Sequence, residues 1–454
     1  MFGKILIANR GEIAVRIIRA CREMGISTVA VFSEADAEEL HTALADEKIC
    51  IGPARADQSY LQEERIISAA LSTGANAIHP GYGFLSESAH FAALCEKNGI
   101  AFIGPDAGTM EKLSDKALTK EKMAAAGLNV IPGAGIVHTA QEARKAAQRI
   151  GMPVMLKARS GGGGRGIRLL ESGDDPEHAY ALSAAEALKA FGDSALYIEK
   201  YIPNARHIEV QILCDEEGNV VCLGERDCSV QRNHQKLIEE TPSPGVSDTQ
   251  RRTLIRRVSS AMKKIGYCGV GTLEFLLDGK FWFMEMNVRL QVEHGVTEML
   301  TGIDLVKWQI RTAAGVQIRF AQKQVPLTGC AIECRINAAS TGTVTTLNRC
   351  LMGRGSFHSI IQTIRRIPSW HWRLILCSRR MRRAICQNCS RICVRLMITQ
   401  MRISRKFISV GITAKWQIRA RRLPVLPARS TAPIFWQQIS GSMKSWSLTW
   451  PPSR

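Results

Sequence analysis

The stretch Trp282–His294, W-F-M-E-M-N-V-R-L-Q-V-E-H, decides the fold because it joins a strand pattern to a line of closely spaced polar groups. The Asp278-Gly279 pair before it favours a hairpin turn, and Gly271–Leu277 forms a suitable partner strand. This spacing predicts that Glu274 and Glu285 lie on facing strands of one sheet.

The polar groups of this hairpin are suited to binding a metal ion and an anion. Glu274, Glu285 and Asn287 offer the hard oxygen ligands that a magnesium–phosphate site requires. Three further residues at alternate positions supply a cation, an amide and a base: Arg289, Gln291 and Glu293. The alternative is an amphipathic edge strand with solvated charges, which this stretch by itself slightly favours. The chemical interpretation therefore depends on the rest of the chain.

Length and composition indicate the class of protein. At 454 residues the chain is long enough for two to four domains, each with its own core. No apolar run approaches the ~20 residues of a membrane helix, and the N-terminus opens into a strand pattern rather than a signal peptide. The 14 cysteines lack regular spacing, which fits reduced thiols better than a disulfide framework. We expect a soluble, cytoplasmic, multidomain α/β protein.

The net charge of +19 is concentrated in the last quarter of the chain. Residues 1–333 contain 38 Lys and Arg and all 41 Asp and Glu, a net charge of −3, whereas residues 334–454 contain 22 Lys and Arg and no acidic residue. An ordinary globular domain carries both signs of charge. Two kinds of sequence are therefore joined near residue 338.

Residues 1–104 alternate short apolar strands with helices, which predicts a parallel sheet with helices on both faces. The expected strands are Ile5–Ala8, Ser27–Phe32, Lys48–Ile51, Ala77–His79 and Ala101–Gly104, and the expected helices are Glu12–Met24, Tyr60–Leu71 and His90–Asn98. The loop Asn9–Glu12 lies where such sheets bind ligands, but it lacks the G-x-G-x-x-G of a dinucleotide site. A structural role for this loop is the preferred interpretation.

A glycine-rich segment, Arg159–Gly166, lies between the expected strands Pro153–Ala158 and Ile167–Leu170. Backbone N–H groups without side chains in the way can surround phosphate oxygens, and Lys157 supplies a positive charge. The segment is not a Walker A loop, because it leads into a strand and lacks the terminal Gly-Lys-Ser/Thr. A flexible linker is an alternative of nearly equal weight, and the neighbouring lysine and arginine favour phosphate.

Beyond residue 194 the pattern is mainly β, with a few helices. Strands are expected over Ala195–Tyr201, His207–Leu213, Val220–Glu225 and Cys330–Ile336, and helices over Asp248–Ile265 and Leu305–Ala314, after an earlier helix over Asp115–Ala126. The polar segment Arg226–Glu240 is predicted to be a loop. A solvated surface excursion is the usual explanation for such a loop.

Eight strings of residues, spread over positions 1–338, carry a resemblance to a known family. They are Ile7–Ile13 (IANRGEI), His79–Glu87 (HPGYGFLSE), Ser160–Gly166 (SGGGGRG), Arg206-His207, Glu225–Ser229 (ERDCS), Gln231–Lys236 (QRNHQK), Glu285–His294 (EMNVRLQVEH) and Glu333–Asn337 (ECRIN). With this set the chain resembles the ATP-grasp enzymes, and more closely the biotin carboxylase subunit or domain of biotin-dependent carboxylases such as acetyl-CoA carboxylase.

The resemblance implies a fold, a domain organisation and a reaction. A Rossmann-like domain is expected over 1–114 and an ATP-grasp central region over 115–203, with a glycine-rich lid at about 131–203. The C-terminal part of the ATP-grasp fold is expected over 204–338. The implied reaction uses ATP with Mg²⁺ or Mn²⁺ to phosphorylate bicarbonate, and the carboxyphosphate formed then carboxylates biotin on a carrier protein. This is the first half-reaction of acetyl-CoA carboxylase, in fatty acid synthesis.

The resemblance also implies roles for individual residues toward the nucleotide and metal. Phosphates would contact Lys116, Lys157, His207 and the lid residues Gly162, Gly163 and Gly164. The adenine would lie among Glu199, Lys200, Ile202 and Leu276, with Gln231 and His234 on the ribose–phosphate side. The metal would be held by Glu274, Glu285 and Asn287, between the β- and γ-phosphates.

For bicarbonate and biotin, the resemblance implies a second set of residues. Bicarbonate would be bound by Lys236, Arg289, Gln291 and the backbone N–H of Val292. Glu293 would be the general base, kept ionised near neutral pH by Arg289 and Lys236. Arg335 would stabilise the enolate-like oxygen of deprotonated biotin. Cys228, beside these residues, is interpreted as a packing residue.

The resemblance ends after Ala338, where the family continues with a mixed domain that completes the sheet and supports a dimer. Residues 339–454 lack acidic residues and clear periodicity, and we hypothesise that they are a frame-shifted remnant of that domain. One alternative is a genuine basic extension that binds nucleic acid, suggested by the cluster Arg379–Arg383; the interspersed Ile, Leu and Trp disfavour it. Another is an inactive or unstable pseudo-enzyme, because a tail without sheet partners would expose core surface.

The implied partners are a biotin carboxyl carrier protein and carboxyltransferase subunits. The carrier's Met-Lys-Met biotin attachment motif does not occur in this chain, which favours a carrier on a separate subunit. A homodimer is expected if the C-terminal domain is intact. The expected fold class is α/β, with a parallel sheet followed by an ATP-grasp fold.

Overall fold

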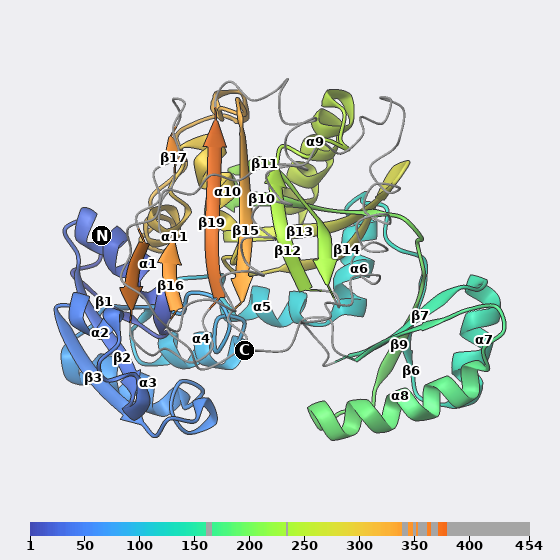
Figure 1. Ribbon diagram of the computed structural model, residues 1–454, viewed down its shortest axis with the longest axis horizontal. Coiled ribbons are helices and arrows are strands. Elements are labelled where there is room, and N and C mark those ends of the chain that lie inside the picture. Colours follow the sequence, from blue (N-terminus) through green and yellow to red (C-terminus); the bar gives the residue numbers. More distant parts are fainter. Residues whose placement is uncertain are drawn as a thin grey trace, which may run out of the picture. The chain divides into compact units, whose positions relative to one another are not determined.

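The computed structural model describes residues 1–159, 166–232 and 235–337, together with the strand segments 344–347, 351–352, 361–364 and 371–378. All of them lie in one compact unit, Met1–Cys386. Three sheets make up most of this unit (Figure 1). We describe the sheets in chain order, because each contributes a different part of the candidate site.

The first sheet is parallel, as the alternation of strands and helices predicts. Its strand order is β3 (Glu47–Gly52), β2 (Ser27–Ser33), β1 (Lys4–Ile7), β4 (Ala77–His79) and β5 (Ala101–Phe102). Its helices are α1 (Gly11–Glu23), the short α2 (Leu40–Leu44), α3 (Glu63–Thr73) and α4 (Ala89–Lys97). Because successive side chains of a strand point to opposite faces, Ile5 and Ile7 pack in one apolar core and Leu6 in another.

The loop after β1 is held by hydrogen bonds to the segment after β4. Asn9 Nδ2 donates to the carbonyl oxygens of Pro80 and Tyr82, at 2.7 and 2.9 Å. Gly11 has a φ of 68°, a left-handed conformation that glycine adopts at little cost. Two of the quoted strings, residues 7–13 and 79–87, are thus joined to each other, which agrees with a structural role for this loop.

The second sheet is antiparallel and four-stranded. Its order is β6 (Gly133–Val137), β9 (Leu196–Lys200), β7 (Val154–Ala158) and β8 (Ile167–Leu170). Two helices that the sequence analysis did not anticipate lie against it, α7 (Ala140–Ile150) and α8 (Pro176–Phe191) (Figure 1). Alanines of both helices pack with β7 and β9 in one core, and the small side chains allow the helices to approach the sheet closely.

The third sheet contains eight strands and carries most of the site. Its order is β14 (Lys280–Asn287), β13 (Gly269–Asp278), β10 (Arg206–Cys214), β11 (Val220–Arg232), β12 (Gln235–Thr241), β15 (Cys330–Asn337), β19 (His371–Ser378) and β17 (Leu351–Met352). The remaining helices are α5 (Ala107–Ser114), α6 (Lys116–Ala125), α9 (Asp248–Ile265), α10 (His294–Thr301) and α11 (Leu305–Ala313), and β16 (Val344–Leu347) pairs with β18 (Ile361–Ile364). Short 3₁₀ turns occupy Glu34–Asp36, Ala56–Gln58 and Gln322–Gln324.

The prediction of a loop over Arg226–Glu240 is wrong. Strand β11 continues to Arg232, and β12 pairs with it in antiparallel fashion, Asp227 lying opposite Glu240. Glu225, Arg226 and Asp227 are all buried. The usual apolar–polar alternation of a strand is absent here because ion pairs, rather than apolar contacts, occupy the inward positions.

The pseudo-enzyme alternative assumed a tail without partners in the sheet, but part of the tail pairs with the sheet. Strand β19 pairs antiparallel with β15 along its whole length, Cys330 opposite Ser378 and Asn337 opposite His371 (Figure 1). Residues 331–334 of β15 therefore pair with β12 on one side and with β19 on the other, and the rest of β15 pairs with β19. Strand β15 carries Arg335, so this pairing supports one residue of the candidate site.

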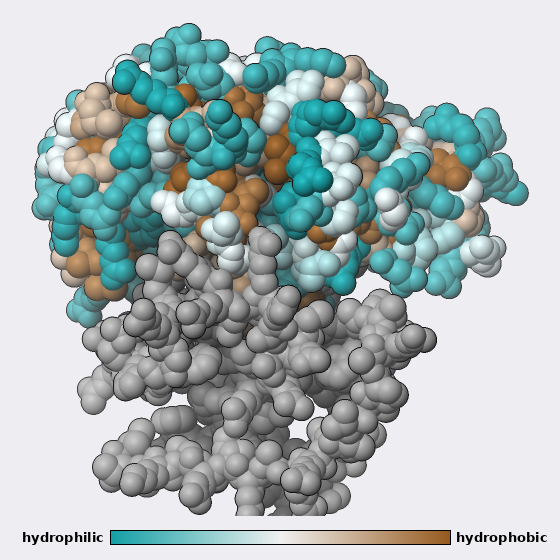
Figure 2. Space-filling model, turned by 90° about the horizontal axis from the view of Figure 1, so that it is seen from above, coloured by the Kyte–Doolittle hydropathy of each residue, from teal (hydrophilic) through white to brown (hydrophobic). Residues whose placement is uncertain are grey.

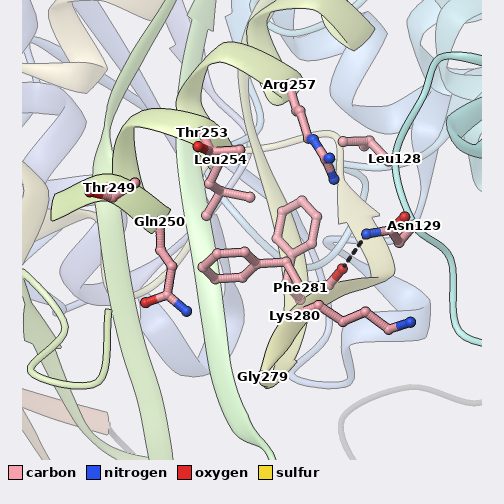
Figure 3. Close-up of a pocket in the computed structure, with 11 residues that line it drawn as sticks. Leu128, Asn129, Thr249, Gln250, Thr253, Leu254, Arg257, Gly279, Lys280 and Phe281 are labelled. Atoms are coloured by element: carbon pink, nitrogen blue, oxygen red, sulfur yellow. Dashed lines mark hydrogen bonds between the residues drawn. The ribbon is translucent and has the colours of Figure 1, made fainter. Parts of the chain in front are cut away.

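The segment that precedes the four-stranded sheet is attached to β14. The backbone N–H of Phe283 donates to Asn129 O at 2.6 Å, and that of Ile131 donates to Phe283 O at 3.2 Å. Beside this attachment lies a cavity of about 200 Å³ between α9 and the β13–β14 hairpin, where the Asn129 side-chain amide contacts the Phe281 carbonyl at 3.5 Å (Figure 3). This segment is thereby attached to the strand that carries Glu285.

Figure 2 shows hydrophilic residues over much of the visible face, with apolar residues interspersed among them. Among the helices that the structure describes, none has the length and apolarity that crossing a membrane requires.

Candidate functional site

One cavity of about 830 Å³ brings together all of the predicted site residues that the structure describes. Its lining comes mainly from the second and third sheets, from helix α6 and from the segments that follow β9 and β14. The predicted residues that line it are Lys116, Lys157, Glu199, Lys200, Ile202, His207, Gln231, Lys236, Glu274, Leu276, Glu285, Asn287, Arg289, Gln291, Val292, Glu293 and Arg335. The predicted lid residues Gly162, Gly163 and Gly164, and also His234, lie outside the described residues.

The hairpin of β13 and β14 places three oxygen-bearing side chains on one part of the cavity wall. Glu274 is the cross-strand partner of Glu285, as predicted, and Thr272 is the partner of Asn287. Asn287 Nδ2 donates to Glu274 Oε1 at 2.8 Å. These two carboxylates and the amide oxygen are hard ligands of the kind that Mg²⁺ prefers, so the donor set fits that ion.

Glu274 is a buried carboxylate with four hydrogen-bond donors. Its Oε1 accepts from Lys236, Asn287 and Gln291, at 3.0, 2.8 and 2.9 Å, and its Oε2 lies 2.7 Å from His207 Nε2. Burial acts to raise the pKa of Glu274, but Lys236 and His207 outweigh it and hold this pKa well below its usual range. Glu274 is therefore ionised at neutral pH.

Lys236 is the common cation of three carboxylates. Its Nζ lies 2.6 Å from Glu209, 3.0 Å from Glu274 and 2.7 Å from Glu293. Burial acts to lower the pKa of Lys236, and the three carboxylates raise it well above its ordinary value. An ammonium group has three N–H donors, so each carboxylate takes one of them.

Glu293 lies between Lys236 and Arg335. Its Oε1 accepts from Lys236, and its Oε2 accepts from Arg335 Nη2 at 2.8 Å. Burial acts to raise the pKa of Glu293, but Lys236, Arg335 and Arg226 together hold it far below its usual range. Glu293 is thus ionised, as expected. Lys236, Arg335 and Arg226 contribute most to this, and Arg289, which was also predicted to do so, interacts electrostatically with Glu293 as well.

Arg289 instead forms an ion pair with Glu87, Nε to Oε2, at 3.1 Å. Its Nη2 also donates to Asn287 Oδ1 at 3.2 Å. Glu87 is the last residue of the string His79–Glu87, which begins at the last residue of β4 in the first sheet. The part of the chain that contains the first sheet therefore contributes Glu87 to the cavity lining. Arg289 is near the metal-ligand set rather than in contact with the carboxylate of Glu293.

Arg335 has a second carboxylate partner that sequence reasoning did not identify. Its Nε forms an ion pair with Glu239 Oε1 at 2.6 Å. Burial raises the pKa of Glu239 to about 7, with Arg335 opposing this and Glu293 adding to it. We call Glu209, Glu239, Glu274 and Glu293, with their cations Lys236 and Arg335, the carboxylate end of the cavity.

The other end of the cavity is rich in lysine. Lys157 Nζ donates to Glu199 Oε2 at 2.7 Å, Lys120 forms an ion pair with the same carboxylate, and Lys116 Nζ lies 3.3 Å from Glu285. Burial lowers the pKa of Lys157 to about 8, and Lys116 adds to this effect by repulsion. We call Lys116, Lys120, Lys157 and Glu199 the lysine end. The sequence offered no signal for Lys120, which lies one helical turn after Lys116.

Two further predicted nucleotide residues have defined partners. Lys200 Nζ donates to the carbonyl oxygens of Gly151 and Met152, at 2.7 and 3.1 Å. His207 Nδ1 accepts from Gln231 Nε2 at 2.8 Å, which leaves Nε2 of the ring to face Glu274. His207 therefore joins the predicted ribose–phosphate residue Gln231 to the metal-ligand set.

Cys228 is fully buried, and burial raises the pKa of its thiol well above the usual value. This protonated, buried thiol agrees with the packing role predicted for it, because the thiolate is the nucleophilic form. Sequence reasoning missed Glu209 and Arg226, which lie within the expected strand and the expected loop. The string Glu225–Ser229 was the available signal for Arg226.

Comparisons with known proteins give a consistent result. Residues 1–110 match the family described as Biotin carboxylase, N-terminal domain, and residues 115–321 match Carbamoyl-phosphate synthase L chain, ATP binding domain. A biotin carboxylase from Nostoc sp. is 55% identical over 340 residues, which are 74% of this chain and 76% of the relative. The 2-oxoglutarate carboxylase small subunit of Hydrogenobacter thermophilus is 52% identical over 341 residues, which are 74% and 72% of the two chains.

A solved structure is similar in fold as well. The biotin carboxylase domain dimer of the Hydrogenobacter thermophilus 2-oxoglutarate carboxylase, in complex with MgADP, ADP and bicarbonate, matches with a TM-score of 0.75 and 46% identity. The match covers 84% of this chain and 87% of that one.

Proposed function

Because this chain belongs to the biotin carboxylase family of ATP-grasp ligases, we propose that it uses ATP and bicarbonate to carboxylate biotin on a carrier protein. The observation that carries the proposal is the placement of Glu293 between Lys236 and Arg335, in the same cavity as the metal-ligand set. The similar Hydrogenobacter domain, which was solved with MgADP and bicarbonate, supports it.

Glu274, Glu285 and Asn287 would hold Mg²⁺ or Mn²⁺, since their oxygen atoms fit such an ion. When bound, the ion would neutralise charge on the β- and γ-phosphates. Lys116 and Lys157 would contact the same phosphates, together with His207. The lid glycines 162–164 and His234 are proposed for the nucleotide on the family resemblance alone.

The adenine would lie beside Glu199, Lys200, Ile202 and Leu276, which line the cavity next to the lysine end. Because Lys157 and Lys120 both contact Glu199, we propose that this carboxylate orients the lysines as well as framing the base. Phosphate binding would supply negative charge to a cluster in which burial disfavours the ammonium form.

Bicarbonate would bind at the carboxylate end, near Gln291, Arg289, Lys236 and the Val292 backbone. Glu293 would accept the bicarbonate proton. With its pKa held so low by two direct cations, Glu293 is a weak base in this arrangement, and an ideal base has a pKa near the working pH. We infer that substrate binding draws Lys236 or Arg335 toward the new anion, which would raise the basicity of Glu293. Arg335 would then stabilise the biotin enolate.

More specific roles rest on the family. The carrier would be a separate subunit, and the carboxybiotin would pass to carboxyltransferase subunits, with acetyl-CoA as the acceptor in fatty acid synthesis. Because one relative is named as a 2-oxoglutarate carboxylase subunit, the final carboxyl acceptor is tested by assaying carboxylation of acetyl-CoA and of 2-oxoglutarate. We also propose that the protein is cytoplasmic and forms a homodimer. The proposed domains end at residues 114, 203 and 338.

We propose further that residues 339–454 arise from a reading-frame shift near codons 338–340. The tail has 22 basic residues and no acidic one, and the curated relatives match only 74% of the chain. Translation of the underlying DNA in the other two frames tests this. A family-like C-terminus in one of them is expected, and its absence from both would remove the hypothesis.

Phosphate release by the purified full-length chain tests the proposed function. We expect ATP cleavage that requires bicarbonate and increases with free biotin. Glu293→Gln should reduce the biotin-dependent rate by about 10²- to 10⁴-fold, the usual contribution of a general base. Glu217→Gln, an exposed glutamate in the turn before β11, is the matched control and should retain full activity. An active Glu293→Gln chain would contradict the base assignment, and an inactive wild-type chain would favour a pseudo-enzyme.

A further inference from the structure

Arg226, in the middle of β11, is a fully buried cation whose hydrogen-bonding capacity is completely used. A guanidinium group has five N–H donors. All five are directed at side-chain oxygens: Glu209 at 2.5 Å, Gln211 at 2.7 Å, Thr297 at 2.9 Å, Thr272 at 3.2 Å and Gln291 at 2.7 Å. Arg226 thereby connects strands β10, β11 and β13 with helix α10 and the segment before it.

The contact with Gln291 determines which way that amide points. A guanidinium group only donates hydrogen bonds, so Arg226 Nη2 accepts no amide N–H and must face the carbonyl oxygen Oε1. The amide nitrogen of Gln291 is therefore turned toward the cavity wall, where it donates to Glu274 Oε1 at 2.9 Å. A reversed amide would direct its oxygen at the carboxylate of Glu274, which is repulsive.

This orientation matters for an anion. Gln291 lines the cavity, and its nitrogen carries two N–H groups, of which Glu274 takes one. The charged oxygens of bicarbonate accept hydrogen bonds from N–H groups and are repelled by a carbonyl oxygen. The amide of Gln291 can thus donate to these charged oxygens only in the orientation in which Arg226 holds it.

The contact with Glu209 extends the same control to Lys236. Arg226 Nε holds Glu209 Oε1, and Glu209 Oε2 holds Lys236 Nζ at 2.6 Å. Lys236 in turn contacts Glu293 at 2.7 Å. Arg226 therefore contacts Gln291 directly and Lys236 through Glu209, both of them residues of the proposed bicarbonate site. Arg226 is not among the described residues that line the cavity.

We propose that Arg226 is a positioning residue for bicarbonate, acting by fixing the amide of Gln291 and, through Glu209, the ammonium of Lys236. The inference rests on the proposed function. Lysine in place of Arg226 keeps the charge but provides a compact ammonium with three donors, which cannot span Glu209 and Gln291 with a planar fork. The Gln291 amide then loses one of the two contacts that fix its orientation, and Glu274 alone holds it.

Steady-state kinetics of Arg226→Lys in the full-length chain test the proposal. We expect the KM for bicarbonate to rise by about tenfold, the loss of one charge-assisted hydrogen bond, while the KM for ATP changes by less than about twofold. A general loss of packing would alter both constants. In a Gln291→Ala background, the same Arg226→Lys change should have little additional effect on the KM for bicarbonate, because the two residues act as one unit. Fully additive effects would overturn the proposal, as would an unchanged KM for bicarbonate.

A milder pair of variants applies where Arg226→Lys fails to fold. Thr297→Val removes one acceptor of Arg226, and Thr301→Val, one turn later on α10, removes a buried hydroxyl that bonds the Thr297 carbonyl instead. The first should raise the KM for bicarbonate by about threefold and the second should not, so equal values would overturn the inference. A wild-type chain without bicarbonate-dependent ATP cleavage would overturn the proposed function and this inference with it, whereas unchanged variants of an active chain overturn the inference alone.

Discussion

The two ends of the cavity balance their charges in different ways. At the carboxylate end, Lys236 and Arg335 hold Glu293 from two sides, and each contact is shorter than 3 Å. At the lysine end, burial lowers the pKa of Lys157 to about 8 and that of Lys120 well below the ordinary value. Cations at both ends are buried and form ion pairs, but the balance differs. At the carboxylate end the carboxylates outweigh burial and raise the pKa of Lys236, whereas at the lysine end burial prevails for Lys157 and Lys120.

This difference indicates what each end requires from a ligand. The carboxylate end is organised in advance, so a small anion has to compete with the carboxylates already bound to its cations. The lysine end gains from a phosphate, since negative charge nearby restores the ammonium form of buried lysines. We therefore expect changes at the carboxylate end to affect folding and catalysis together, and changes at the lysine end to affect ATP binding mainly.

The largest expected effect is that of Lys236→Met, which breaks the carboxylate end. Three carboxylates, those of Glu209, Glu274 and Glu293, would lose their common cation. Removing one partner of a buried ion pair costs about 3–5 kcal/mol, and activity should fall below detection. Urea unfolding measures the loss of stability. Lys263→Met, an exposed change on α9, should leave both quantities unchanged, and a stable Lys236→Met chain would show that this cation does not organise the end.

Lys157→Met should have a smaller effect, confined to ATP. Loss of a charged hydrogen bond to phosphate corresponds to a rise in the KM for ATP of about 10- to 100-fold. The loss of stability should be smaller than in Lys236→Met, because Glu199 keeps Lys120 as a second cation. Since the pKa of Lys157 is about 8, the wild-type KM for ATP should also rise as the pH passes above 8. Lys189→Met, exposed on α8, is the control. A KM that does not change with pH in the wild type, or a large loss of stability in Lys157→Met, would remove the distinction between the two ends.

The smallest expected effect is a change in the pH dependence of stability in Glu239→Gln. The pKa of Glu239 is raised to about 7 in the folded chain, so the folded state binds this proton more tightly than the unfolded state, whose pKa is about 4.3. The resulting stabilisation is complete below pH ~4.3 and is lost as the pH rises through 7.

Glu239→Gln removes this contribution. The difference between the free energies of unfolding at pH 5 and pH 8 should shift by about 2 kcal/mol relative to the wild type. Glu293 has a lowered pKa, so its contribution has the opposite sign and is lost only in acid. An identical pH profile in Glu239→Gln would show that Arg335 keeps Glu239 ionised throughout this range.

Much of the fold was predictable from local patterns. The parallel order of the first sheet follows from the alternation of strands and helices. The facing positions of Glu274 and Glu285 follow from the Asp278-Gly279 turn and from the alternation of side chains along the two strands. The segment Arg226–Glu240 was predicted incorrectly because its inward residues are charged. Their burial is compensated by partners elsewhere in the chain, which a local window does not contain.

The sequence predicted many residues of the candidate site but not the contacts between them. The motif strings identified Lys236, Glu293 and Arg335, and the structure brings them together. It also pairs Arg289 with Glu87 and surrounds Glu209 with Arg226 and Lys236. None of these pairs is close in sequence, and an arginine or glutamate carries no local indication of which opposite charge it will meet.

The amino-acid sequence by itself determined the hairpin to which Trp282–His294 belongs and the residue types along it. It also determined the break in composition near residue 338. These features depend on spacing and local propensity. The tertiary structure decided that Gln291, 65 residues from Arg226, is held by that arginine, and that β19 completes the pairing of β15. Such contacts form only when distant strands share one sheet and their buried charges must find partners there. The physical reason is desolvation: a charge removed from water is stable only beside an opposite charge.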